Sequence, residues 1–258
     1  MPASPGPLVR AWRERRRLSQ LALACEAEIS QRHLSFIESG RATPSRNMLL
    51  RLAERLEAPL RDRNALLLSA GYAPLYPDRG LDDPALGPAR AAIERVLAAH
   101  EPYPALAIDR RWNLVLANPA AARLMAPIDP VLARPPVNVI RASLHPQGLS
   151  SRIVNLAAWR AHLMERLRRQ AALTGDREIE ALLVEVSAYP GPNAAPAADP
   201  ADDIAVPLRL RTHAGLLSMF STVTVFGTPV EVTLAELSIE SFYPADPETA
   251  RLLRETAG

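Results

Sequence analysis

The chain has 258 residues, of which 48% are hydrophobic and 22% charged, so it can bury a core and does not have the composition of a disordered protein. Its single cysteine, Cys25, excludes an intramolecular disulfide and a clustered thiolate metal site. No apolar run approaches the ~20 residues that span a bilayer, and the N-terminal segment lacks a signal-peptide apolar stretch. We expect a cytoplasmic protein with no membrane contact.

The net charge of +2 is unevenly distributed along the chain. Residues 1–70 contain twelve arginines and seven acids, a balance of +5, whereas residues 71–258 contain eighteen arginines and twenty-one acids, a balance of −3. A basic segment joined to a mildly acidic body indicates that the N-terminal part meets a polyanion.

The first 70 residues have the pattern of five short helices. Serines at 19, 30 and 45 are suitable N-caps, Gly40 is placed to end the third helix, and Pro59 ends the fourth. The apolar spacing predicts one apolar stripe of Leu8, Val9 and Trp12. On the next three helices it predicts these inward-facing residues: Leu21, Ala22 and Cys25; Leu34 and Ile37; Met48, Leu49, Leu52 and Leu56. We expect Cys25 to be a buried, unreactive thiol.

Residues 71–88 are rich in proline and glycine and are predicted to be a linker between domains 1–70 and 89–258. The second domain is predicted to contain helices over 89–99, 119–125, 153–173 and 176–186, and strands on both sides of Asp109–Arg111 and over 206–211, 216–226 and 230–242. A shift in the apolar phase predicts a β-bulge near Ala235, and residues 188–203 are predicted to be a mobile surface loop. Consecutive strands joined by tight turns favour an antiparallel sheet with helices against it, an α+β fold.

The third predicted helix has two different faces. With Leu34 and Ile37 directed inward, Gln31, Arg32, Ser35 and Phe36 face outward and His33 lies at the flank. Glutamine and arginine match the hydrogen-bonding edges of adenine and guanine, and a helix fits the major groove, which is about 12 Å wide. This helix is therefore a candidate for reading double-stranded DNA.

The stretch from Arg15 to Pro59, with its Ser-Gln opening, Glu-Ser-Gly-Arg and Pro-Ser, resembles the helix-turn-helix domain of the xenobiotic-response-element, or Cro/C1-type, regulators. That family often has glycine where this chain has Glu28, and a positive φ there would cost roughly 1 kcal/mol. The resemblance implies an all-α domain with DNA-binding residues at Gln20, Ser30, Gln31, Arg32, His33, Ser35, Phe36, Arg41 and Arg46. Within that set Gln20, Arg41 and Arg46 would hold phosphates. Glu38, outside the set, would be a structural partner and not a DNA contact.

The remaining chain resembles the MmyB-like regulators through HEPYPALAIDRRWNLVLANPAA, IVNLAAWRAHL and FSTVTVFGTPVEVTLAELSIESFYP. The resemblance implies a PAS-like domain, with helices over one face of an antiparallel sheet, that binds a small apolar, fatty-acid-like ligand. Candidate wall residues are Trp112, Leu114, Leu116, Trp159, Leu163, Phe220, Val223 and Phe226, and candidate partners for a carboxylate head group are Arg141, His145 and His162. Each of these residues also fits an ordinary role in a core or on a surface.

Nothing in the sequence predicts catalysis. It lacks a Gly-x-Ser-x-Gly elbow, a P-loop and a dinucleotide-binding glycine pattern, and His162 with Glu165 is a weak metal motif without a second pair. We expect no catalytic residue, no metal and no cofactor. The prediction is a homodimeric transcription regulator that binds a DNA operator. The alternatives are a protein-interaction module without DNA, and an enzyme with a tethered DNA-binding domain.

Overall fold

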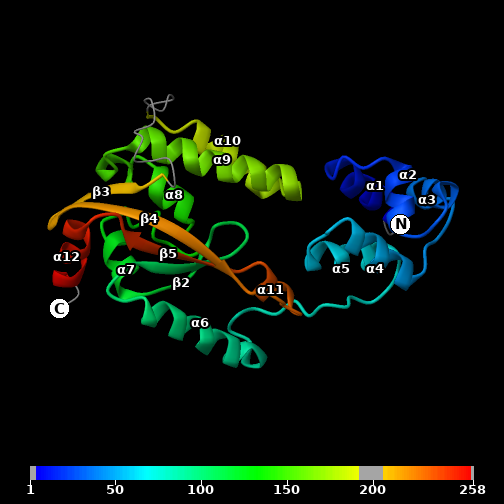
Figure 1. The fold of residues 1–258 in the computed structure, drawn as a ribbon, viewed down its shortest axis with the longest axis horizontal. Helices are drawn as coiled ribbons and strands as arrows, with labels where there is room; N and C mark the ends of the chain where they lie inside the picture. The colour runs from blue at the N-terminus through cyan, green and yellow to red at the C-terminus, as the bar shows by residue number, and fades with distance from the viewer. Residues whose placement is uncertain (1–3, 192–205, 257–258) are drawn as a thin grey trace. The chain divides into compact units, whose positions relative to one another are not determined.

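The computed structural model describes residues 4–191 and 206–256. The chain forms two compact units (Figure 1). One holds the chain up to Gly80 together with Gly227–Ala235, and the other holds Leu81–Phe226 and the chain from Glu236 onward. A short segment near the end of the sequence therefore belongs to the N-terminal unit.

Five α-helices follow one another in the N-terminal unit: α1 (Pro5–Arg15), α2 (Gln20–Glu26), α3 (Gln31–Glu38), α4 (Arg46–Arg55) and α5 (Leu60–Ser69). The three predicted serine caps are confirmed, since the Oγ atoms of Ser19, Ser30 and Ser45 accept backbone N–H groups at 3.0, 3.1 and 3.3 Å. Each cap satisfies a donor that the first turn of a helix leaves free.

All five of these helices also end in the same way. The residue two positions beyond each helix has a positive φ, namely Arg17, Glu28, Gly40, Glu57 and Gly71, with values from 48° to 82°. At the end of α2, the N–H of Glu28 donates to the carbonyl of Cys25 and that of Ile29 to Ala24, which is the Schellman arrangement. Glu28 thus adopts the left-handed conformation that its place in the motif predicted, although it is not glycine.

The core of the N-terminal unit confirms the predicted inner face of α3 and corrects that of α2. Leu34 and Ile37 are fully buried. In α2 the buried residues are Leu23 and Ala24, followed by Ala27, whereas Leu21 and Cys25 are exposed. Both sets have helical spacing, but only the buried one continues through Ala27 into the turn. The expectation of a buried Cys25 is therefore wrong.

The segment after α5 is fastened to the N-terminal unit. Asn64, which is buried, donates to the carbonyl of Tyr76 at 2.7 Å and accepts the N–H groups of Leu75 and Tyr76. The inserted helix α11 (Val232–Ala235) joins the same segment, because the N–H of Val232 donates to Pro77 and Glu231 accepts the N–H of Arg79 at 2.8 Å. The first half of the predicted linker is therefore held in place.

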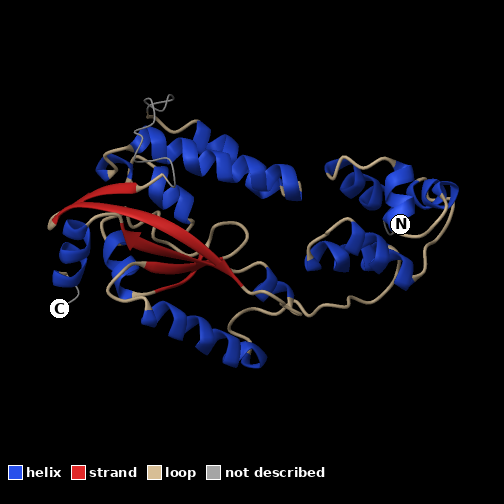
Figure 2. Ribbon diagram, viewed as in Figure 1, coloured by secondary structure: helices blue, strands red, loops and turns tan. Residues whose placement is uncertain are grey.

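The C-terminal unit combines helices with an antiparallel sheet, which confirms the predicted α+β class (Figure 2). The strands are β1 (Ala105–Ile108), β2 (Leu114–Ala117), β3 (Leu208–Thr212), β4 (Gly215–Val225) and β5 (Ser238–Pro244), in the order β2-β1-β5-β4-β3. The helices are η1 (Pro84–Leu86), α6 (Gly87–Ala99), α7 (Pro119–Met125), α8 (Val139–Leu144), η2 (Ser150–Arg152), α9 (Leu156–Thr174), α10 (Arg177–Ser187) and α12 (Pro247–Glu255).

Helices cover both faces of this sheet, whereas the family resemblance implied one. All four residues of β1 are buried. Leu106 and Ile108 join the main hydrophobic core, while Ala105 and Ala107, which alternate with them, point to the other face. Figure 1 shows α9 and α10 on one side of the sheet and α6 on the other.

The predicted last strand, Val230–Phe242, is wrong in its first half. Residues 232–235 form α11 instead, and β5 begins at Ser238, so the expected bulge near Ala235 is a helical turn. Glu231 supports the helical turn by accepting the N–H of Leu234, and it also accepts that of Arg79. Helices α8 and α12 were not predicted. The predicted surface loop over 188–203 lies, from 192 on, outside the described residues.

Candidate functional site

The outer face of α3 presents polar groups that the fold does not use. Gln31 and Arg32 are exposed, and within residues 4–191 and 206–256 neither side chain makes a hydrogen bond. Two guanidinium groups lie near the ring of Phe36, with Arg32 Cζ 5.3 Å and Arg41 Cζ 5.1 Å from its centroid. Phe36 thus holds two cations beside the helix at little cost in conformational freedom.

A buried ion pair fixes α3 to the rest of its unit. Glu38 Oε1 accepts from Arg13 Nε at 2.6 Å, and Oε2 accepts from Arg13 Nη2 and from Gln20 Nε2, both at 2.9 Å. Burial alone would raise the pKa of the Glu38 carboxyl, but these hydrogen bonds and the charge of Arg13 outweigh it and lower the pKa below its ordinary value. Glu38 therefore has the structural role predicted for it.

The other predicted DNA contacts are divided between the surface and the interior. Ser30 is the N-cap of α3, and His33 and Ser35 on α3 and Arg46 on α4 are half-buried. Gln20 is engaged with Glu38. Three consecutive arginines follow Glu14, and the middle one, Arg16, donates to the carbonyls of Leu56 and Glu57.

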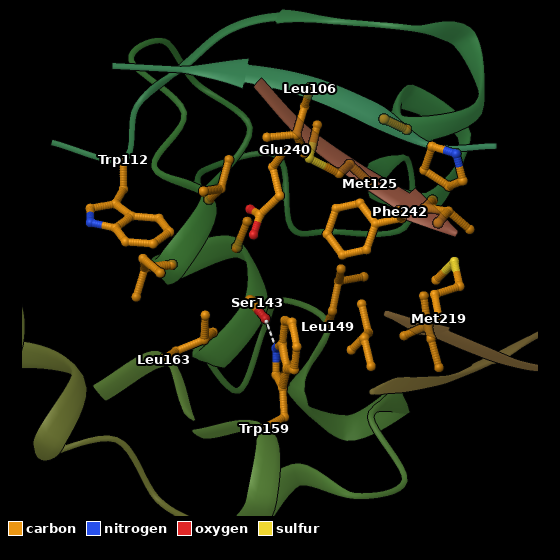
Figure 3. A pocket seen from close by; sticks show the side chains of 18 residues that line it. Leu106, Trp112, Met125, Ser143, Leu149, Trp159, Leu163, Met219, Glu240 and Phe242 are labelled. Atoms are coloured by element: carbon orange, nitrogen blue, oxygen red, sulfur yellow. Dashed lines mark hydrogen bonds between the residues drawn. The ribbon is translucent and has the colours of Figure 1, made fainter. Parts of the chain in front are cut away.

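The C-terminal unit contains an apolar cavity of about 80 Å³ between the sheet and helices α7, α8 and α9. Of the 18 side chains that line it, only Ser143 and Glu240 are polar apart from the indole N–H groups (Figure 3). Ser143 Oγ already accepts from Trp159 Nε1 at 2.9 Å. A dry cavity of about 150 Å³ holds benzene, so this one accepts only a few carbon atoms unless its walls move. Met125 and Met219 in the wall are flexible enough for such movement.

Trp112 lines this cavity from a strained turn. Its φ is 65°, which is rare for a bulky residue. Asp109 supports the turn by accepting the N–H groups of Arg111 and Asn113, both at 2.8 Å. The indole Nε1 of Trp112 donates to Gln170 at 2.8 Å, and Arg166 Cζ lies 4.5 Å from the ring centroid. Strain of this kind concentrates at binding sites.

The structure brings together only some of the predicted ligand residues. Trp112, Trp159 and Leu163 line the cavity, whereas Leu114 packs against the core behind it. Phe220 pairs with Tyr243 across β4 and β5 and stacks on its ring, and Phe242, next to Tyr243, lines the cavity. Because neighbouring residues in a strand point to opposite faces, Phe220 lies on the face away from the cavity. Phe226 and Val223 are not among the lining residues.

The predicted head-group partners lie outside the cavity lining. Arg141 forms a two-pronged ion pair with Glu185, whose carboxylate also accepts from the Tyr189 hydroxyl. Burial and this contact raise the pKa of Tyr189 to about 12. The His145 ring packs on Tyr189 at 4.9 Å. His162 stacks on Trp159, and burial, with the charge of Arg166, lowers the pKa of its imidazole.

Sequence reasoning missed the most polar residue of the cavity. Glu240, which is 5% exposed, lies between Ile239 and Ser241 in β5 and in phase with Phe242. The signal in the sequence was an acid two positions before Phe242 in a predicted strand, and therefore on the same face as that aromatic side chain. Arg166 Nη1 donates to Glu240 Oε1 at 2.7 Å.

Comparison with known proteins agrees with this arrangement. Residues 89–255 match the model of the MmyB-like transcription regulator ligand binding domain, and residues 6–66 match a helix-turn-helix domain. The chain belongs to the MmyB-like transcription regulators. It is a DNA-binding regulator with a C-terminal domain for a small-molecule ligand.

Other comparisons add little about this MmyB-like regulator. A search of curated proteins finds none that matches it. A solved structure described as an RNA-binding Light-Oxygen-Voltage receptor is 16% identical, with a TM-score of 0.25. That match covers 98% of this chain and 62% of the receptor chain, and a likeness this remote establishes neither a shared fold nor a shared activity. Within the described ranges, no helix is long and apolar enough to cross a bilayer.

Proposed function

We propose that this regulator binds a specific DNA operator through α3 and that a small apolar, fatty-acid-like molecule in the C-terminal cavity controls it in the cytoplasm. The observation that carries the DNA part is the combination of fully buried Leu34 and Ile37 with exposed Gln31 and Arg32 on one short helix. Arg32 would read a guanine edge and Gln31 an adenine edge. Phe36, whose ring has Arg32 and Arg41 nearby, would meet a thymine methyl group.

The test starts from an operator selected out of random duplexes with the full chain. Arg32→Ala should then relax base choice at one position by about 1–3 kcal/mol, and affinity should fall steeply with salt. Arg55→Ala on α4, an exposed arginine with no proposed base contact, is the matched control and should leave base choice intact. Unchanged operator choice in both Arg32→Ala and Gln31→Ala would contradict this assignment of the reading helix.

We further propose that the regulator acts as a homodimer. One reading helix contacts few base pairs, and two copies on half-sites about 34 Å apart would supply useful specificity. Sedimentation of the full chain with and without its operator measures this directly. A single copy bound to the selected operator at saturation would contradict the dimer.

The α11 segment supports a route by which the ligand acts on DNA binding. It is continuous with β5, which carries Glu240 and Phe242 into the cavity wall, and it is held to residues 77–79 of the N-terminal unit by Glu231, Val232 and Thr233. A ligand that shifts β5 would change these hydrogen bonds and bias the DNA-binding unit.

Glu231→Ala tests this route, because it removes the acceptor of the Arg79 N–H. We expect operator affinity without ligand to stay within about threefold of wild type, and the change in affinity caused by the ligand to shrink by about tenfold, the usual size of such coupling. Glu248→Ala is the control, because Glu248 is an exposed acid whose ion pair, with Arg251, lies within α12 and away from the α11 segment. Undiminished coupling in Glu231→Ala would exclude this route.

A further inference from the structure

We propose that a second hollow beside the apolar cavity holds the charged end of the ligand, and that Arg152 and Arg123 bind its carboxylate there. This inference rests on the proposed fatty-acid-like ligand and assigns the two ends of that molecule to different parts of the C-terminal unit. The second hollow, which we call the outer basin, has a volume of about 330 Å³. Its walls come from α7, η2, the hairpin of β3 and β4, and α12.

Positive side chains line the outer basin from three elements. Arg123 comes from α7, Arg152 from η2 and His213 from the turn between β3 and β4. Arg152 is half-buried, and its guanidinium makes no hydrogen bond or ion pair with any residue in the described ranges. Arg123 has a long contact with Glu101, at 3.6 Å. Both guanidinium groups can therefore donate to a carboxylate in the basin, and their planar fork suits such a partner.

The acid in the wall of the outer basin does not cancel these charges. Both oxygens of Glu255 accept from Arg251 Nη1, at 2.6 and 2.7 Å, and Arg251 is not a lining residue. The apolar part of the wall includes Leu210, Leu217 and Leu253. Cations beside an apolar wall fit a molecule that has an anionic end and a hydrocarbon chain.

The outer basin and the apolar cavity share part of their walls. Leu124 on α7 and Leu210 on β3 line both hollows, so these two side chains separate them. Leu210 is two residues from Leu208, which pairs with Met219 of β4. Figure 3 shows Met219 and Trp112 at opposite ends of the cavity, so the basin adjoins its Met219 end. Leu124 is only half-buried, and a change of its rotamer would join the two hollows.

The charge inside the cavity sets the direction in which the ligand lies. The acid there, Glu240, is at the Trp112 end, since Arg166 contacts both of them. Glu240 pairs with Val223 in β4, and Leu217 in the wall of the basin lies six residues back along that strand, about 20 Å away. A ligand carboxylate at the Trp112 end would meet like charge in an apolar surrounding, whereas one in the basin would meet cations. The hydrocarbon chain therefore extends into the cavity, and the carboxylate stays in the outer basin.

Octanoate and methyl octanoate test this arrangement, because they share the same chain and only octanoate is charged at pH 8. Calorimetric titration of the full chain measures both affinities. The wild type should bind octanoate about five- to tenfold more tightly, since a hydrogen bond between two charged groups is stronger than one to a neutral carbonyl by about that factor. The preference should weaken as salt is added, because the basin is open to solvent.

Substitutions of the arginines locate the carboxylate. Arg152→Gln should reduce the preference for octanoate to within about twofold and leave the affinity for methyl octanoate unchanged. Arg152→Lys keeps the charge and should keep most of the preference. Arg123→Gln should have a smaller effect, because Arg123 also contacts Glu101. Arg95→Gln, at an exposed arginine of α6 that lines neither hollow, is the matched control and should keep the wild-type preference.

The outcomes separate this inference from the proposed function. Equal affinities of the wild type for octanoate and methyl octanoate would overturn the carboxylate site and leave apolar ligand binding standing. A preference for octanoate that survives in the double variant Arg123→Gln, Arg152→Gln would overturn it as well, because the carboxylate would then be bound elsewhere. Binding of neither probe to the wild type would remove the proposed ligand function and this inference together.

Discussion

Two buried glutamates, one in each unit, are paired with arginine in different ways. Glu38 in the N-terminal unit is 8% exposed, and both of its oxygens accept hydrogen bonds from Arg13 or Gln20. Glu240 in the C-terminal unit is 5% exposed, and within the described residues only its Oε1 accepts any. Burial and charge are thus nearly the same at the two sites, while the hydrogen-bonding capacity left over is not.

This difference separates a structural ion pair from a binding group. A carboxylate whose oxygens all accept hydrogen bonds from its own fold has no acceptor left for a ligand. Its role is to hold the packed helices together. A carboxylate with one open oxygen in a cavity can recognise a partner. Burial alone therefore does not identify a functional acid, and counting the free lone pairs does.

The same substitution at the two sites gives the largest expected contrast. In Glu38→Gln, the amide NH₂ must face a donor from either Arg13 or Gln20, so we expect the N-terminal unit to lose about 3 kcal/mol of unfolding free energy. In Glu240→Gln the carbonyl still accepts from Arg166 and the NH₂ faces the cavity, so only the charge of the pair is lost, and the loss in its unit should be smaller, about 1 kcal/mol. Urea unfolding followed by hydrogen exchange in peptides from each unit measures both, and equal losses would break the comparison.

Acid should erase the contribution of Glu38. Its folded-state pKa lies below the value of about 4.3 in the unfolded chain, so the ionised carboxylate stabilises the fold fully above pH ~5. That stability is lost as the pH falls through the folded-state value. The gap in unfolding free energy between wild type and Glu38→Gln should therefore narrow below pH ~4. A gap that stays constant down to pH 3 would show that ionisation is not its cause.

The sequence predicted the N-terminal unit better than the C-terminal one for a physical reason. Caps, turns and the inner face of α3 depend on neighbours within a few residues, which the sequence displays directly. The inner face of α2 was misjudged because Leu21, Ala22 and Cys25 have the same spacing as the buried Leu23, Ala24 and Ala27. Only contacts with other helices distinguish two such faces.

The cavity depends on residues far apart in the sequence, which the pattern could not place. Trp112 and Trp159 were identified by their size, but Glu240 and Arg166 are 74 positions apart and were not predicted to meet. The helix α11, found where a strand was predicted, is joined to a distant segment by the hydrogen bond from Arg79 to Glu231, 152 positions apart. The missed helix α12 did have a local signal in Asp246-Pro247, where Asp246 Oδ1 accepts the N–H of Thr249 at 2.6 Å.

Arg32 extends the comparison to the protein surface. Within the described residues its guanidinium donates no hydrogen bond, just as Oε2 of Glu240 accepts none. Arg32→Ala should therefore cost 1–3 kcal/mol in discrimination at one base pair and almost nothing in folding stability. Arg13→Ala should instead lower the folding stability and leave the discrimination between base pairs unchanged, since Arg13 is paired with Glu38. Binding to operator variants, together with urea unfolding of the two proteins, compares these effects. A loss of folding stability in Arg32→Ala would show that Arg32, like Arg13, has a structural role.

Glu28→Gly tests the smallest effect, the cost of the turn that sets α3 against α2. Glu28 has a φ of 56°, which costs a non-glycine residue about 1 kcal/mol, and its ion pair with exposed Arg51, at 3.7 Å, is worth little. Glycine relieves the strain but gains freedom in the unfolded chain, so we expect a net stabilisation of at most about 1 kcal/mol. Glu26→Gly, within α2, should instead destabilise by a similar amount. If Glu28→Gly also destabilises, the Schellman turn carries no strain, and Glu28 fits it as well as glycine would.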